Sequence, residues 1–170
     1  QIARRAIECT AELPNTDDTL AKIIDSSPVP AFVIDADHVV THWNRACEQI
    51  IGVPAGDILG TRHHWRAFYP TQRPIMADLV ITGEMSLLQQ LYSNKYRKSQ
   101  LIDGAFEAED YFPAFDRWLF FTAAPLRDKD GQIIGAIETL QDISERKRAE
   151  IALSAAKQAA ETAANAKTEF

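Results

Sequence analysis

Residues 31–52, AFVIDADHVVTHWNRACEQIIG, decide the fold class of this chain. Ala31–Asp35 is a short run of residues that favour strands, and residues 39–43 are a second such run. Asp37 and His38 stand between the two runs, where a turn is expected. The stretch therefore predicts a β-hairpin.

The next element is a helix with a signal at each end. Asn44 can accept a hydrogen bond from the free backbone amides of a helix start, which makes it a natural N-cap. Gly52 tolerates the left-handed conformation with which many helices end. Arg45–Ile51 is therefore predicted to be a helix that follows the hairpin directly.

Three more strands are predicted nearer the C-terminus. They cover residues 106–112, 118–126 and 133–141, and Asp130-Gly131 marks a tight turn before the last of them. The strand over residues 118–126 is apolar on both faces, which predicts a central place in a sheet that is covered on both sides. Five antiparallel strands with helices packed on one face make an α+β domain.

This domain is expected over residues 28–143, with helices on both sides of it. Before it, residues 1–27 are predicted to be helical, with an apolar stripe on residues 1–13 and a second short helix over residues 19–26.

After the domain, residues 144–170 are predicted to form one long signalling helix. Half of residues 149–166 are alanine, in a seam of heptad-like spacing. An alanine seam buries little area per residue, so it indicates a weak coiled-coil contact between two helices. A single solvated helix is the alternative.

The bulk composition excludes several classes of protein. The chain has 170 residues and a formal net charge of −6, which gives no electrostatic reason to expect nucleic-acid binding. It has no signal peptide and no apolar stretch long enough to span a bilayer. Its two cysteines, Cys9 and Cys47, lack metal-site spacing and are expected to be reduced thiols in a cytoplasmic protein. Because the chain begins at Gln1, we expect a piece of a longer protein, with an upstream anchor in the inner membrane possible.

Several pieces of the chain, in their order, resemble the PAS family of sensory domains. They are the first helix and strand (residues 24–35), the strand-to-helix junction (43–48), two glycine stops (Gly52 and Gly60), the last hairpin (130–135) and the exit into a signalling helix (142–150). The resemblance covers residues 19–150. It implies a PAS fold, with a five-stranded antiparallel sheet, helices on one face, and signalling helices at the N-terminal and C-terminal ends.

The last four residues, Lys167-Thr168-Glu169-Phe170, resemble the start of the phospho-acceptor helix of sensor histidine kinases. This resemblance implies a bacterial two-component sensor, with the kinase core downstream in the same chain and a parallel homodimer as the working unit. The 170 residues contain no phosphate-binding loop and no set of residues arranged for nucleophilic catalysis. We therefore expect this part of the protein to have no enzymatic activity of its own.

A pocket between the sheet and the middle helices is expected to bind a small molecule. The candidate ligand-binding residues are His64, Trp65, Phe68, Tyr69, Arg73, Met76, Phe120 and Thr122. Arg73 is expected to form an internal ion pair with Asp78 or Glu84; holding a carboxylate in the pocket is the alternative. No metal site and no cofactor is predicted.

Two other functions stay open from the sequence. His63 or His64 could be the axial ligand of a haem in an apolar pocket, which would make the domain a gas or redox sensor. Alternatively, the domain could fill its own pocket and act only as a structural dimerisation and relay element. A cavity with converging polar groups would favour sensing over a structural relay.

Signal transfer is expected where the last strand meets the long helix, at Asp142, Ile143 and Ser144. Asp142 can accept hydrogen bonds from the free amides of the helix start, and its charge suits the positive end of the helix dipole. The same residue belongs to the sheet, so it is expected to tie the two elements together.

Overall fold

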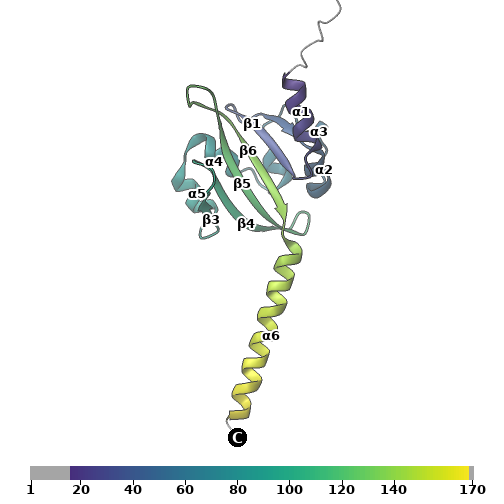
Figure 1. Ribbon diagram of the computed structural model, residues 1–170, viewed down its shortest axis with the longest axis vertical. Helices are drawn as coiled ribbons and strands as arrows, with labels where there is room; N and C mark the ends of the chain where they lie inside the picture. The colour runs from purple at the N-terminus through teal and green to yellow at the C-terminus, as the bar shows by residue number, and fades with distance from the viewer. Residues whose placement is uncertain (1–15, 169–170) are drawn as a thin grey trace, which may run out of the picture.

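The computed structural model describes residues 16–168. These residues form one six-stranded antiparallel sheet in the order β2-β1-β6-β5-β4-β3 (Figure 1). The strands are β1 (Ala31–Asp35), β2 (Val40–Trp43), β3 (Tyr96–Lys98), β4 (Phe106–Phe112), β5 (Arg117–Arg127) and β6 (Ile133–Asp142). The first and last strands of the domain, β1 and β6, are therefore neighbours.

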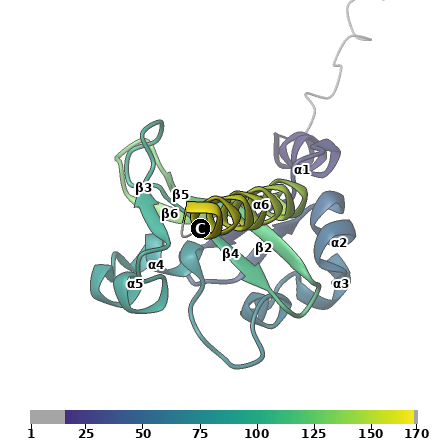
Figure 2. The same cartoon turned by 90° about the horizontal axis from the view of Figure 1, so that it is seen from below.

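Most of the helices lie on one face of the sheet, and the last one leaves it. They are α1 (Thr16–Ser26), α2 (Arg45–Ile51), α3 (Ala55–Ile58), the 3-10 helix η1 (His64–Ala67), α4 (Met76–Thr82), α5 (Met85–Leu91) and α6 (Ser144–Thr168). Helix α4 packs across β5 and β6, while α2 packs against β1. Helix α6 continues from the end of β6 and projects away from the domain as a long rod (Figure 1 and Figure 2).

The predicted α+β class and antiparallel sheet are confirmed, with one strand more than the five expected. The additional strand is β3, which pairs with β4 at the edge of the sheet. It has three residues, two of which are the charged Arg97 and Lys98, so no hydrophobic pattern marks it. The helix predicted over residues 1–13 lies outside the described residues.

The strand predicted over residues 118–126 lies in the middle of the sheet as expected, but only one of its two faces is covered by helices. It is β5, which pairs with β4 and β6. Leu119 and Phe121 are buried toward the helices, whereas Trp118 and Phe120 are only half-buried. Because successive side chains of a strand point to opposite faces, β5 presents two aromatic rings to the more open face of the sheet. The prediction that both faces are covered is therefore wrong.

Asn44 ties the hairpin to the helices on both sides of it. Its Oδ1 accepts hydrogen bonds from the backbone N–H groups of Cys47 (2.9 Å) and Ala31 (3.0 Å). Its Nδ2 donates to two backbone carbonyls in the segment before β1. Helix α2 ends at Gly52, which has a φ of 81° in the left-handed region. Both helix signals predicted from the sequence are confirmed.

Aromatic side chains fill much of the space between the sheet and the helices. The ring centroid of Phe32 lies 5.3 Å from that of Trp43 and 5.9 Å from that of Phe68. The ring of Phe112 lies 5.8 Å from Phe68 and 5.9 Å from Phe121, again between centroids. Full burial of such a side chain contributes roughly 1.5–3 kcal/mol, so this cluster fixes the middle segment on the sheet.

Helix α6 packs against the sheet through its first turn. Ser144 is buried, and Lys147 binds Glu109 of β4 through an ion pair of 2.8 Å. The residues from 149 to 168 are all exposed. None of the helices within residues 16–168 combines the length and the apolarity that crossing a bilayer requires.

Candidate functional site

A hollow of about 370 Å³ opens on the helix side of the sheet. It lies between the β1–β2 turn, the segment around η1, and helices α4 and α5. Its lining includes His38, His64, Trp65, Arg73, Asp78 and Leu87. This helix-side hollow falls at the small end of the range of roughly 300–1,000 Å³ that ligand pockets occupy.

Asp78 is the centre of a hydrogen-bond network beside the hollow. Its carboxylate accepts from Nε2 of His64 (2.9 Å), from Nδ1 of His38 (2.6 Å) and from the backbone N–H of Ile75 (2.9 Å). Burial alone would raise the pKa of Asp78, but these hydrogen bonds lower it below its usual range. The carboxylate is therefore ionised at neutral pH, and it joins the β1–β2 turn, η1 and α4.

Glu138 is a buried carboxyl group on the core-facing side of β6. It is 3% exposed, and its Oε2 accepts a hydrogen bond from the backbone N–H of Ala77 in α4 (2.9 Å). Burial raises the pKa of Glu138 to about 8; the bond from Ala77 opposes this rise, and the charge of Asp78 adds to it. Glu138 is therefore mostly protonated at neutral pH, and it links α4 to the strand that runs into α6.

The predicted ion pair of Arg73 with Asp78 or Glu84 is wrong: none of the ion pairs within residues 16–168 includes Arg73. Its guanidinium carbon lies 3.9 Å from the ring centroid of Tyr69 and 5.0 Å from that of Tyr92. A cation over aromatic faces is attracted by their electron density. The charge of Arg73 is thus held in place without a neutralising carboxylate.

The predicted ligand-binding residues separate into those at the hollow and those behind it. His64, Trp65 and Arg73 line the hollow, while Phe68 and Met76 are buried in the core and Tyr69 is half-buried. The structure therefore brings together the polar candidates of the middle segment, and it uses the apolar ones for packing.

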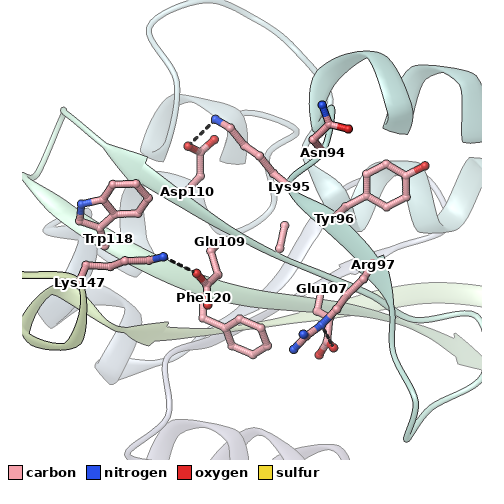
Figure 3. A pocket seen from close by; sticks show the side chains of 11 residues that line it. Asn94, Lys95, Tyr96, Arg97, Glu107, Glu109, Asp110, Trp118, Phe120 and Lys147 are labelled. Atoms are coloured by element: carbon pink, nitrogen blue, oxygen red, sulfur yellow. Dashed lines mark hydrogen bonds and ion pairs between the residues drawn. The ribbon is translucent and has the colours of Figure 1, made fainter. Parts of the chain in front are cut away.

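Phe120 and Thr122 do not reach this hollow. They alternate along β5 with Phe121, which packs in the core, so they point to the opposite face of the sheet. Figure 3 shows Phe120 with Trp118 and Lys147 at an outer groove of about 520 Å³ on that face. The sequence-based choice of these two residues selects the wrong side of a strand that is apolar on both sides.

The histidines of the middle segment do not fit a haem. Nε2 of His64 is engaged by Asp78, and its ring packs 6.5 Å from that of Phe32. His63 is exposed at the surface, where no apolar pocket surrounds it. Within residues 16–168, no group of three or more His, Cys, Asp or Glu side chains is placed to hold a metal ion.

His38, which lines the hollow, and Glu138, which contacts α4 behind it, are not among the candidates from the sequence. His38 meets Asp78 across 40 residues of chain, and no local pattern marks such a contact. Glu138 stands between Ala136 and Leu140 in the period-2 pattern of β6. An acidic residue on an otherwise apolar strand face is the signal that could have found it.

The predicted coupling residues form one hydrogen-bonded junction between β6 and α6. Oδ1 of Asp142 accepts from the backbone N–H of Ser144 (2.9 Å), and Oδ2 binds Nη1 of Arg117. The Ser144 hydroxyl oxygen accepts from the backbone N–H of Trp118 (3.0 Å), and Ile143 is buried. Burial alone would raise the pKa of Asp142, but the contacts with Ser144 and Arg117 lower it. The first residue of α6 is thus bonded to both β5 and β6.

Comparisons with known proteins agree with this architecture. A family model described as the PAS fold matches residues 24–148, which is most of the chain. A solved RNA-binding light-oxygen-voltage receptor is 18% identical with a TM-score of 0.54, and the match covers 90% of this chain and 40% of that one. The PAS domain of BvgS from Bordetella pertussis is 19% identical with a TM-score of 0.49, and the match covers 85% of this chain and 99% of that chain.

Proposed function

The chain belongs to the PAS fold family, and from this premise we propose that it is the sensory and relay module of a dimeric bacterial sensor histidine kinase. In this proposal a small molecule binds at the helix-side hollow, and α6 carries the response to a kinase core further along the same chain. Phosphoryl transfer belongs to that core.

The observation that carries the proposal is the direct passage from β6 into α6. The strand ends at Asp142 and the helix begins at Ser144, with the buried Ile143 between them. The same strand holds Glu138, whose carboxyl group is bonded to α4 beside the hollow. A rearrangement of α4 therefore has a continuous bonded route to the base of α6.

Sensing is favoured over a purely structural relay by the hollow itself. A self-filled relay domain needs no binding hollow, whereas this domain has one, open to the surface and lined by both polar and apolar side chains. A ligand shifts the equilibrium between two states only by the difference of its affinities for them. The proposal therefore requires that α4 and β6 differ between the bound and the free state.

Asp142→Ala is expected to leave the domain folded and to change the output of the parent kinase. The variant loses the acceptor for the Ser144 N–H and the partner of Arg117, at a cost of about 0.5–2 kcal/mol. This is small against a typical domain stability of roughly 5–15 kcal/mol, yet it alters the bonds at the base of α6. The measurements are thermal unfolding of the fragment and autophosphorylation of the full-length kinase.

The matched control is Asp130→Ala, in the exposed turn between β5 and β6. It removes a carboxylate of the same kind and should change neither unfolding nor autophosphorylation. If Asp142→Ala folds and its kinase output equals that of Asp130→Ala, the junction does not transmit the signal.

We also propose that the chain forms a parallel homodimer, held more by its N-terminal segment and the sheet than by α6. Leu20 and Ile23 of α1 are 51% and 60% exposed, and the sequence predicts a further apolar stripe on residues 1–13, outside the described residues. Apart from Ile151 and Leu153, the apolar residues in the exposed part of α6 are alanines, which bury little area per residue in a two-helix contact.

Removal of the residues after Glu150 is therefore expected to leave the dimer intact. Removal of residues 1–15 is the complementary variant and should raise the monomer fraction. Light scattering at micromolar concentration measures both. A monomer after the C-terminal truncation, with a dimer after the N-terminal one, would reverse this ranking.

A further inference from the structure

Three buried side-chain nitrogens lack a hydrogen-bond partner within residues 16–168, and all three belong to residues that line the helix-side hollow. They are Nδ1 of His64, Nε1 of Trp65 and Nη2 of Arg73. A buried donor that stays unpaired loses its hydrogen bonds to water without replacement, and native proteins contain few such groups. Their gathering at one hollow indicates that an external group completes their hydrogen bonds.

Two of these nitrogens are donors in every protonation state of the site. The indole nitrogen of Trp65 and the guanidinium of Arg73 only donate hydrogen bonds. His64 gives one proton to Asp78 through Nε2, so its Nδ1 donates only when the ring is also protonated. The missing partner is therefore first of all an acceptor.

The charge of the site specifies an anionic acceptor. Arg73 is fixed over Tyr69 and Tyr92 and has no carboxylate partner among the described residues, so its charge is available to a ligand. A planar guanidinium edge matches the two oxygens of a carboxylate.

The rest of the lining limits the size and total charge of that ligand. The hollow measures about 370 Å³, and Leu79 and Leu87 give it an apolar wall. Asp78 and Glu84 also line it and offset the positive charges of Arg62 and Arg73, so the lining has no excess positive charge to hold a second negative group. A molecule with one carboxylate and a short apolar body meets all of these conditions.

We propose that the helix-side hollow binds a small organic monocarboxylate. Its oxygens accept hydrogen bonds from Arg73 and Trp65, and its apolar body lies against Leu79 and Leu87. This inference rests on the proposed sensory function, to which it gives the chemical class of the input. The route to the output begins at His64, which contacts Asp78 of α4, and continues from Ala77 of α4 to Glu138 of β6.

Titration calorimetry of the 170-residue chain tests the proposal with sodium butyrate and sodium pyruvate as probes. Butyramide, which has no charge, and inorganic phosphate, which has no apolar body, are the comparison ligands. We expect at least one carboxylate to bind with a Kd below about 10 mM. Its Kd should be at least about tenfold lower than that of butyramide or phosphate.

Arg73→Leu and Trp65→Phe then test the two donors. Each is expected to weaken carboxylate binding, Arg73→Leu by at least about tenfold. Trp65→Phe keeps an aromatic ring while it removes the N–H together with part of the indole, so it remains informative if Arg73→Leu fails to fold. Arg97→Leu, on the opposite face of the sheet beside Glu107, is the matched control and should leave affinity unchanged.

The proposal is overturned if neither carboxylate binds, if butyramide or phosphate binds as tightly, or if both Trp65→Phe and a folded Arg73→Leu bind as the unmodified chain does. Such a result leaves the proposed function intact when Asp142→Ala still changes kinase output. Conversely, the carboxylate could bind in a way that depends on Arg73 and yet leave autophosphorylation unchanged. That result would contradict the proposed sensory function but support the proposed binding site.

Discussion

Replacement of Asp78 by alanine is expected to lower the free energy of unfolding by about 3–5 kcal/mol, the usual cost of removing one partner from a buried charged network. The substitution leaves His38, His64 and the backbone N–H of Ile75 without their common acceptor. Since these groups belong to the β1–β2 turn, η1 and the start of α4, all three segments lose a fixed contact at once.

Urea denaturation of the 170-residue chain at neutral pH measures this loss. The matched control is Asp25→Ala, which breaks an exposed ion pair with the Arg45 side chain and an exposed hydrogen bond from its backbone N–H, and should cost about 1 kcal/mol. Asp78→Asn retains one acceptor oxygen and should fall between the two. Equal losses for Asp78→Ala and Asp25→Ala would show that the network does not stabilise the fold.

Glu138→Gln is expected to remove a large part of the pH dependence of stability. The pKa of Glu138 is raised from its ordinary value of 4.5 to about 8 in the folded chain. Between these values the folded state keeps a proton that the unfolded state has released, so stability falls as the pH rises through this window. The slope approaches about 1.4 kcal/mol per pH unit for one such group, and glutamine has no proton to lose.

From about pH 5 to pH 8, the free energy of unfolding of the glutamine variant should therefore rise relative to that of the unmodified chain. Above about pH 8 the difference between the two should stay constant. Urea denaturation at several pH values measures the difference. Glu109→Gln is the control, because ion pairs with Lys147 and Arg146 lower the pKa of Glu109 and move its contribution to more acid pH. Parallel curves for Glu138→Gln and the unmodified chain across the whole window would mean that Glu138 is not protonated in the folded state.

The fold was predictable wherever a signal depends on neighbouring residues. Asn44 and Gly52 predict the two ends of α2 because a cap acts within one helical turn, and both have the predicted role. Strand β3 was not predictable, because three residues at a sheet edge show neither alternation nor an apolar run. Its existence depends on the partner strand β4 and not on its own sequence.

The site was predictable only in the part that one segment supplies. His64, Trp65 and Arg73 lie within ten residues of one another, and the structure gathers them at one hollow. The contact of Glu138 with α4 joins residues 61 positions apart, so only the folded sheet brings it to the site.

The same limit explains the misplacement of Phe120 on β5. When both faces of a strand are apolar, the sequence contains no information on which face meets the helices. That choice depends on the register of the strand between its two neighbours.

The exposed rod α6 has a mechanical consequence. Its 25 residues extend about 37 Å at 1.5 Å per residue, and only the first turn is anchored to the sheet. The helix therefore acts as a lever arm with its fulcrum at Ser144. A tilt of about 5° at that fulcrum displaces the far end by about 3 Å, but moves the first turn by less than about 0.5 Å. Rearrangements at the base that are too small to disturb the packing of the domain are thus amplified to several ångströms at the far end of the helix.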